Sequence, residues 1–411
     1  MSEGGQIFQA TDPKRWRNFK WSFRIVLIIA LFFIVVLTVA IISGTNPSIP
    51  NLEAKSKAYQ QKLDPTNPMT LSQRFNKKYK GFKDFLIKKI KEDSVNTLKG
   101  RDLTASVIPN IRAAFYTPWT GNTSLPDLEK YGSKLNVIFP EWFFIDTITH
   151  HLQTRIDSAG LALMQQKKLR IMPILTNFNS SLKDFDGRLL HDILNNDAKR
   201  KSFITQVADT LSHYHLDGIN VDFEELREST NTPLSTFQQE LYETLHARGM
   251  TITMDVAVDN NDYDYGKLSL YNDYIVLMAY DQFNPSTAAG PISAQKWIEG
   301  AVDRAAKKIE PGKIILGIAG FGYDWYKTSE GKDTCASINY NDAINKAKIK
   351  NVKIDFDNDS YNLHYNYTDE ESLKEGDTET IDHEIWCTDA ATTFNVLRFS
   401  DEYQTDRKSV V

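Results

Sequence analysis

The stretch His215-Leu-Asp-Gly-Ile-Asn-Val-Asp-Phe-Glu-Glu225 decides how this chain is interpreted. Its composition predicts a β-strand over residues 216–223, and the side chains of a strand alternate between two faces. Asn220, Asp222 and Glu224 therefore share one face. The opposite face is apolar and consists of Ile219, Val221 and Phe223. One strand thus predicts a row of polar groups on the inner side of a sheet and an apolar side that packs against helices.

Strand-like and helix-like segments alternate on both sides of this stretch. The predicted strands, several of them almost continuously apolar, cover residues 112–117, 135–140, 169–175, 216–223, 250–256, 273–279 and 313–317. The predicted helices cover residues 153–168, 197–215, 235–249 and 293–309. Apolar strands that alternate with helices are typical of a parallel sheet covered on both faces. Because no GxGxxG or P-loop motif follows any of these strands, the pattern favours an α/β (β/α)8 TIM barrel over an open doubly wound sheet.

The acids of the central strand also predict chemistry. Active sites of such barrels lie at the carboxyl ends of the strands, which is where Asp222 and Glu224 are expected. Neighbouring buried carboxylates repel each other, so at least one pKa rises and one group keeps its proton near neutral pH. We therefore expect a general acid. No His or Cys lies nearby at the spacing of metal ligands, so the sequence predicts no metal and no other cofactor.

The central strand resembles the fourth strand of the family 18 glycoside hydrolases, the chitinase-like group, which carries DGxDxDxE. The matching residues are Asp217, Gly218, Asp222 and Glu224, and Asn220 departs from the pattern. Residues 278–281, Met-Ala-Tyr-Asp, are similar to the family's MxYD motif on the sixth strand, and residues 317–322 to its glycine-rich seventh strand. The resemblance covers residues 111–403 and implies the barrel fold.

The resemblance also implies a mechanism in which the substrate takes part. Glu224 would protonate the glycosidic oxygen, and the 2-acetamido oxygen of the sugar would attack C1 to give an oxazolinium ion. Asp222 would accept from the acetamido N–H, and Tyr280 would donate to its carbonyl. The anomeric configuration would be retained, and the substrate would be a glycan with N-acetylhexosamine. Further residues expected to bind substrate are Asn220, Asp281, Met278, and the aromatic side chains Tyr116 and Trp142, with Trp119, Phe178, Trp325 and Tyr326 as other stacking candidates.

Asn220 leaves a second function open. An amide donates a hydrogen bond but cannot take up the charge or the proton that a third Asp would share with Asp222, so turnover would be slow. Residues 220–224, Asn-Val-Asp-Phe-Glu, are similar to the branch directed against spore cortex and peptidoglycan. The alternative is a catalytically silent glycan-binding module. A pure binder has no use for a carboxyl that keeps its proton, which favours the enzyme.

The amino-terminal part predicts a membrane anchor. Residues 25–42 are apolar and uncharged, and five Lys or Arg residues precede them. We expect a cytoplasmic tail at residues 1–24, a transmembrane helix at 25–43, a stalk with a basic amphipathic helix at 44–110, and the barrel outside the cytoplasm. A cleaved signal peptide is the alternative. The net charge of −5 over 411 residues gives no basis for a nucleic-acid partner.

The pattern changes in the carboxyl-terminal part. Residues 332–388 are polar and predict a small α+β insertion with a helix at 342–348 and two antiparallel strands at 353–356 and 361–366. Its Cys335 and Cys387 are disulfide candidates, and two buried thiols are the alternative.

A helix at 390–403 is expected to lead toward an eighth strand that we do not find in the sequence. The barrel would then span residues 111–405 with two open edges, and residues 406–411 resemble a translated sequencing adapter. The anchored arrangement resembles bacterial proteins in which such a barrel is fused to a polysaccharide deacetylase and a family 2 glycosyltransferase, so these are expected partners, fused or associated.

Overall fold

The computed structural model describes residues 21, 24, 111–119, 124–328, 330–372, 378–402 and 409–410. The chain divides into two units, Met1–Arg101 and Asp102–Val411. The predicted transmembrane helix at 25–43 and the predicted stalk at 44–110 lie outside the described residues. Among the residues that are described, no helix combines the length and the apolar character needed to cross a membrane.

The centre of the second unit is a closed ring of parallel strands. In chain order around the ring these are β1 (Arg112–Tyr116), β2 (Val137–Ile145), β5 (Ile174–Thr176), β8 (Gly218–Asp222), β9 (Thr251–Ala257), β10 (Tyr274–Met278) and β11 (Ile314–Gly317). The short β4 (Arg170–Ile171) extends the third position, and β3 (Leu152–Thr154) pairs antiparallel with β2. Each of the seven predicted strands is present, which confirms the barrel.

The prediction of two open edges is wrong for this structure. β17 (Ser409–Val410) lies between β11 and β1 and pairs in parallel with both. These two residues belong to the segment that we expected not to be part of the barrel. Backbone hydrogen bonding at a strand edge requires no particular side chain, so a short segment of any sequence can fill the place of the eighth strand. Whether residues 406–411 belong to the natural protein stays a prediction.

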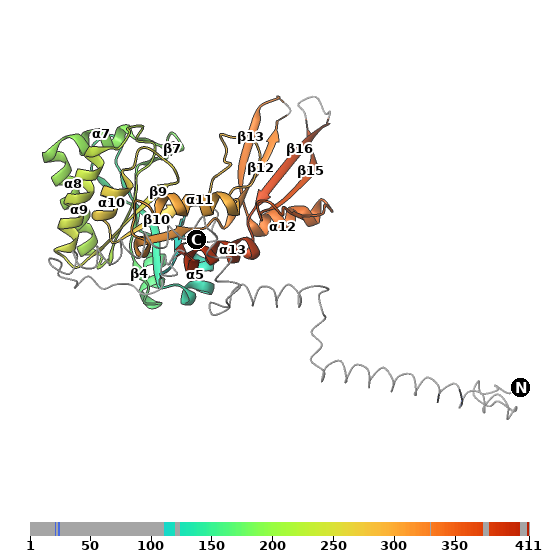
Figure 1. The fold of residues 1–411 in the computed structure, drawn as a ribbon, viewed down its shortest axis with the longest axis horizontal. Coiled ribbons are helices and arrows are strands. Elements are labelled where there is room, and N and C mark those ends of the chain that lie inside the picture. Colours follow the sequence, from blue (N-terminus) through green and yellow to red (C-terminus); the bar gives the residue numbers. More distant parts are fainter. Residues whose placement is uncertain are drawn as a thin grey trace, which may run out of the picture. The chain divides into compact units, whose positions relative to one another are not determined.

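Helices follow the strands and cover the barrel (Figure 1). The four predicted helices correspond to α6 (Ser158–Gln166), α8 (Asp197–His213), α9 (Thr232–His246) and α11 (Gln295–Ala305). Further helices of the described part of the barrel are α5 (Ser124–Tyr131), η1 (Gly132–Lys134), α7 (Arg188–Asn195), α10 (Tyr265–Leu270), η2 (Pro311–Lys313) and α13 (Ala390–Glu402). The first predicted helix starts too early, because the Asp157 side chain accepts from the N–H groups of Ala159 and Gly160 and so fixes the helix start at Ser158.

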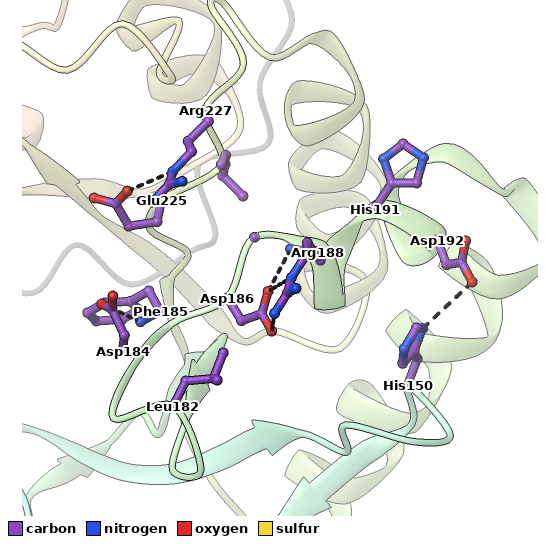
Figure 2. Close-up of a pocket in the computed structure, with 12 residues that line it drawn as sticks. His150, Leu182, Asp184, Phe185, Asp186, Arg188, His191, Asp192, Glu225 and Arg227 are labelled. Carbon is purple, nitrogen blue, oxygen red and sulfur yellow. Dashed lines mark hydrogen bonds and ion pairs between the residues drawn. The ribbon is translucent and has the colours of Figure 1, made fainter.

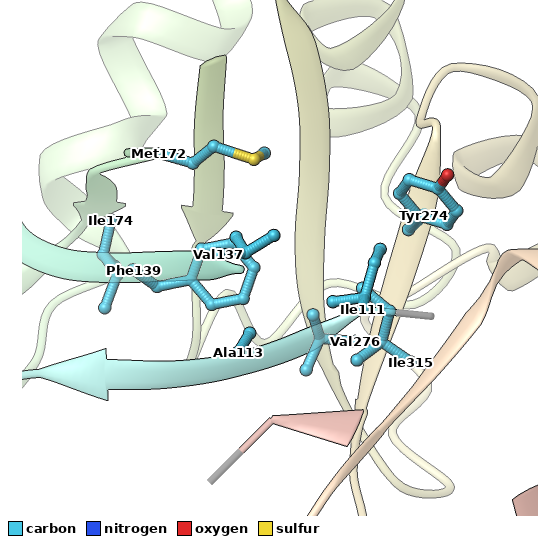
Figure 3. Packing of buried hydrophobic residues seen from close by; sticks show 9 residues of the cluster. All are labelled: Ile111, Ala113, Val137, Phe139, Met172, Ile174, Tyr274, Val276 and Ile315. Atoms are coloured by element: carbon cyan, nitrogen blue, oxygen red, sulfur yellow. The ribbon is translucent and has the colours of Figure 1, made fainter. Parts of the chain in front are cut away.

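Alternate residues of the strands fill the lower part of the barrel interior (Figure 3). This cluster consists of Ile111, Ala113, Val137, Phe139, Met172, Ile174, Tyr274, Val276 and Ile315, each at most 7% exposed. On β8 the outward set packs against helices as predicted: the Phe223 ring lies 5.5 Å from the Phe237 ring of α9. Gly218 begins β8 where a Cβ would lie 2.0 Å from the Thr251 carbonyl oxygen, so only glycine fits there. The lower interior is therefore apolar, and the polar residues of the strands lie above it.

The insertion is larger than predicted. It forms an antiparallel sheet of order β13-β12-β16-β15-β14, with β12 (Phe321–Lys327), β13 (Asp333–Asn339), β14 (Asp355–Phe356), β15 (Leu363–Ser372) and β16 (Thr378–Cys387), and carries α12 (Tyr340–Ile349) (Figure 1). The predicted helix and the antiparallel pairing of β14 with β15 are confirmed. The sheet starts at Phe321 instead of residue 332, since β12 follows closely after β11.

The disulfide prediction is wrong, because Cys335 and Cys387 are free thiols. They lie on β13 and β16, which β12 separates. Cys335 pairs with Trp325 and Cys387 with Gly322 of β12, and positions 322 and 325 face opposite sides of the sheet. The two thiols therefore lie on opposite faces of the sheet, and burial raises the pKa of each to about 12.

Candidate active site

The polar residues predicted on β8 lie on the inner face of the barrel, above the apolar cluster. Strand register places Asn220 beside Thr253 of β9, and Asp222 beside Thr176 of β5. Asn220 is fully buried; its Nδ2 donates to Asp255 Oδ2 at 2.7 Å, and its Oδ1 accepts from Thr253 Oγ1 at 2.6 Å. The amide is thereby fixed in one orientation.

Glu224 follows β8, and its backbone is held from two sides. The fully buried Asn177, just after β5, donates from Nδ2 to the Glu224 carbonyl oxygen at 2.8 Å and accepts from the Glu224 N–H at 3.0 Å. The hydroxyl of the buried Tyr263 donates to the Phe223 carbonyl oxygen at 2.9 Å. These bonds fix the position of the Glu224 side chain at the barrel mouth.

Burial raises the pKa of each carboxyl group at this mouth. Burial, and then the charge of Asp222, raise the pKa of Glu224 to about 9. The pKa of Asp222 is raised well above its usual range by burial and by the neighbouring Asp255, despite hydrogen bonds to Glu224 and Thr176. Burial likewise raises the pKa of Asp255. Glu224 is therefore a neutral acid at physiological pH and can donate a proton to a bound molecule.

Tyr280 and Asp281 reach the same mouth from the end of β10. Burial and the charges of Asp255 and Asp222 raise the pKa of the Tyr280 hydroxyl well above its usual range, so this group is a neutral donor. A Cβ at Gly317 would lie 3.1 Å from the Tyr280 ring, so β11 supports the ring closely. Asp281 has a left-handed backbone, with φ 58°, and its Oδ1 accepts from the Tyr323 hydroxyl of β12 at 2.9 Å.

The remaining predicted substrate-binding residues differ in exposure. Met278 faces the barrel interior and is partly buried. Tyr116 is 2% exposed and Trp142 is 0% exposed, so the prediction that they stack on sugar rings is wrong. Tyr116 faces outward, where its hydroxyl bonds Asp157, and Trp142 follows Glu141 at a β-bulge of β2. Trp119 is 48% exposed at the end of β1 and remains a stacking candidate.

Four residues of the mouth were missed by the sequence analysis: Glu141, Asn177, Asp255 and Tyr263. Glu141 faces inward from β2, its pKa is raised by burial, and its charge raises the pKa of Asp222. Asp255 and Glu141 could have been found as single acids within or after an apolar strand. Asn177 could have been found from the polar residues that follow residue 175. Tyr263 lies in a loop and gave no signal.

A hollow of about 900 Å³ lies beside α7 and residues 225–227, the segment that follows Glu224 (Figure 2). Glu225, the neighbour of Glu224, lines it, together with α7 and the hairpin of β6 (Phe178–Asn179) and β7 (Asp184–Phe185). Two ion pairs line it, Arg188 with Asp186 at 2.8 Å and Arg227 with Glu225 at 3.2 Å. The acids Asp184 and Asp192 line it as well. Within the described part of the chain, no cluster of His, Cys, Asp and Glu has the geometry of a metal site.

Comparison with known proteins agrees with this geometry. The profile of "Glycosyl hydrolases family 18" matches residues 157–390, more than half of the chain. The "uncharacterized glycosylase YvbX" of Bacillus subtilis is 26% identical over 297 residues, 69% of this chain and 83% of that protein. The "cortical fragment-lytic enzyme" of the same organism is 24% identical over 254 residues, 58% of this chain and 56% of that protein.

The fold agrees as well. The crystal structure of a chitinase from Chromobacterium violaceum superposes with a TM-score of 0.63 at 20% identity, covering 73% of this chain and 93% of that one. The family profile spans β8 with its acids, β10 with Tyr280, and most of the insertion. The chain therefore belongs to the glycosyl hydrolases of family 18 and is a glycosidase of the chitinase-like class.

Proposed function

We propose that this glycosidase cleaves polysaccharide containing N-acetylglucosamine, either an exopolysaccharide or peptidoglycan, by a retaining mechanism in which the substrate's acetamido group is the nucleophile. The observation that carries the proposal is the pair of Asp222 and Glu224, hydrogen-bonded to each other beneath the barrel mouth, with the pKa of Glu224 raised to about 9. A retaining enzyme with its own nucleophile needs a carboxylate that bonds the anomeric carbon, whereas here we assign Glu224, which holds its proton, as the acid, and Asp222 as the acceptor for the acetamido N–H.

The residues would divide the work as follows. Glu224 donates its proton to the glycosidic oxygen while the acetamido oxygen forms a bond to C1 and the C1–O bond to the leaving sugar breaks. Asp222 accepts from the acetamido N–H, and the neutral Tyr280 hydroxyl donates to the acetamido oxygen. Water then attacks C1 of the oxazolinium ion, the bond between C1 and the acetamido oxygen breaks, and the water gives a proton back to Glu224. The two displacements at C1 leave its configuration unchanged.

The hollow lined by Glu225 and Arg188 has a volume of about 900 Å³, which is enough for sugar units of a bound glycan (Figure 2). Its paired donors and acceptors suit the hydroxyl groups of a polysaccharide. The name of the cortical fragment-lytic enzyme supports peptidoglycan as one substrate.

Asn220 supports a second candidate, a glycan-binding module without turnover. Its amide is locked between Thr253 and Asp255 and holds no proton to exchange with Asp222. Such a module would use the same cleft to guide a polymer. A deacetylase and a glycosyltransferase, fused or associated, remain its predicted partners.

One experiment separates the candidates. The chain is incubated with N-acetylglucosamine oligomers, with the same oligomers after deacetylation, and with peptidoglycan, beside Glu224→Gln. Cleavage of the acetylated substrates only, with retained configuration by NMR and a loss of at least about a hundredfold in Glu224→Gln, is the expected result. If wild type and variant bind these glycans equally and neither cleaves them, the binding module is correct.

We further propose that residues 25–43 tether the enzyme to a membrane, with the barrel outside the cytoplasm. The support is the long uncharged stretch and the preceding Lys and Arg residues. The test is fractionation of cells that express the chain, followed by protease treatment of intact spheroplasts. Recovery in the membrane fraction with a protease-accessible barrel is expected, and a protected or freely released barrel would contradict the topology.

A further inference from the structure

Two buried carboxyl oxygens at the barrel mouth have no hydrogen-bonding partner among the described residues: Asp222 Oδ1 and Asp255 Oδ1. They belong to neighbouring parallel strands. The register pairs Val221 with Met254, so Asp222 and Asp255 are the next residues on each strand, and both face the barrel interior. Neighbouring strands are about 4.8 Å apart, so the two side chains lie side by side.

The other oxygen of Asp255 already has a donor. Asp255 is 2% exposed, and its Oδ2 accepts from Asn220 Nδ2 at 2.7 Å. The carbonyl oxygen of that amide accepts from the Thr253 hydroxyl, so the amide cannot rotate to change the hydrogen bond that it donates to Asp255. The groups that face Asp255 are Asn220 and Asp222 of β8, Glu224, Thr253 of its own strand and Tyr280. None of these is a cation.

Two ionised carboxylates in this setting would be destabilised twice, by loss of hydration and by mutual repulsion. A single proton held by the pair removes one charge and supplies the donor that both bare oxygens lack. Asp222 is the member that must be ionised when it accepts from an acetamido N–H. The proton therefore belongs on Asp255 during the reaction.

We propose that Asp255 is a positioning residue: it holds the one proton of the Asp222–Asp255 pair and presents it to Asp222, which remains the carboxylate. If the proton is on Asp222 in the free enzyme, its O–H bond breaks and an O–H bond forms at Asp255 Oδ1 before the acetamido group is bound. The proton count of the pair stays at one. The placing of the proton on Asp255 and the kinetic part of this inference rest on the proposed function, whereas the presence of one proton in the pair does not.

The presence of the proton is tested without substrate. Infrared difference spectra of wild type minus Asp255→Asn at pH 7 are expected to contain the C=O stretch of a neutral carboxylic acid. Isotope labelling of Asp is expected to shift this band and so assign it to an Asp carboxyl. Only a carboxylate band in that difference would mean that the Asp222–Asp255 pair holds no proton, and the inference would be wrong. Because no glycan is needed, this result is independent of whether the proposed substrate is correct.

Kinetics test the role. Asp255→Asn keeps a neutral N–H donor of the same size, so its kcat is expected within about threefold of wild type, with an unchanged acid limb of the pH profile. Asp255→Ala removes the donor. Asp222 then ionises less readily, so the acid limb is expected to move about one pH unit upward and kcat at pH 7 to fall about tenfold, with little change in KM.

A matched control is Asp273→Asn, which removes a carboxyl at the opposite end of β10, where Asp273 contacts His246 and the Ile252 N–H. It is expected to lower the unfolding temperature and leave the pH profile unchanged. If Asp255→Asn is as impaired as Asp255→Ala, the negative charge and not the proton is required, and the inference fails. It also fails if Asp255→Ala loses stability with no shift of the acid limb. Should Asp255→Ala not fold, the infrared result and Asp255→Asn decide alone.

Discussion

Glu224 keeps its proton because its backbone is fixed in a place that water reaches poorly. Its pKa of about 9 results first from burial and second from the charge of Asp222. A side chain free to turn into solvent would return to its ordinary pKa, so the backbone bonds from Asn177 and Tyr263 are part of the cause. The acid of this site is thus made by its neighbours.

The pH profile should reflect this pKa. The proton-donating form of Glu224 is lost as the pH rises through about 9, so kcat/KM is expected to stay high through neutral pH and fall above about pH 9. Initial rates on N-acetylglucosamine oligomers between pH 4 and 10.5 measure this directly. An alkaline limb near pH 6 would contradict the burial of Glu224.

The same pKa predicts a stability effect. Between pH 4.5 and about 9, folded Glu224 binds a proton that the unfolded chain does not, so the free energy of unfolding decreases as the pH rises through this window. Gln at this position has no such dependence. Glu224→Gln is therefore expected to unfold at a higher temperature than wild type at pH 8 and at a similar one at pH 4. Calorimetry at both pH values is the measurement, and equal stability at pH 8 would count against the raised pKa.

At the scale of elements, the site depends on contacts between strands more than on β8 itself. Asn177 follows β5 directly, β9 supplies Asp255, and β2 supplies Glu141. Each faces the same mouth because parallel strands end at one edge of the barrel. The element that carries the motif therefore contributes the reacting groups, and its neighbours fix their position and protonation.

Asn177→Ala tests this dependence. It removes both hydrogen bonds to the Glu224 backbone, so Glu224 is expected to shift and kcat to fall about tenfold to hundredfold. Asn272→Ala is the matched control, because Asn272 is equally buried and bonds Gln238 and the Leu268 carbonyl away from the mouth. The control should lose comparable stability and keep its kcat. Equal losses of kcat in both variants would mean that Asn177 acts only through stability.

At the scale of the whole described unit, the sequence predicted what depends on local pattern. Apolar runs located the barrel strands, and alternation on β8 placed Asn220 and Asp222 inside. The same alternation applied to β1 places Tyr116 outside, since Ala113 faces inward, so that error was avoidable. The error for Trp142 was not avoidable, because a β-bulge shifts the register of β2 at Glu141.

Pairing between distant segments could not be predicted in the same way. Nothing within residues 250–256 tells that Asp255 accepts from Asn220, because the bond depends on the register of β9 against β8. The disulfide prediction was wrong for the same reason. In the sheet, β12 lies between the strands of Cys335 and Cys387, and local sequence pattern does not predict this strand order. Local pattern therefore predicts elements, whereas long-range register decides the environment of each acid.

The insertion and the barrel meet at the active site, and this contact carries the last prediction. Tyr323 of β12 donates to Asp281 and packs beside Phe321, whose ring lies 6.0 Å from Tyr280. Tyr323→Phe leaves Asp281 without this donor at a left-handed backbone position, so the end of β10 is expected to loosen and kcat to fall about threefold to tenfold. Tyr367→Phe removes a hydroxyl from the other face of the same sheet, where it bonds Asp324. That control should lower the unfolding temperature without changing kcat. The two variants together therefore separate support of the active site from stability of the insertion. An unchanged kcat in Tyr323→Phe would show that the insertion does not position Tyr280 or Asp281.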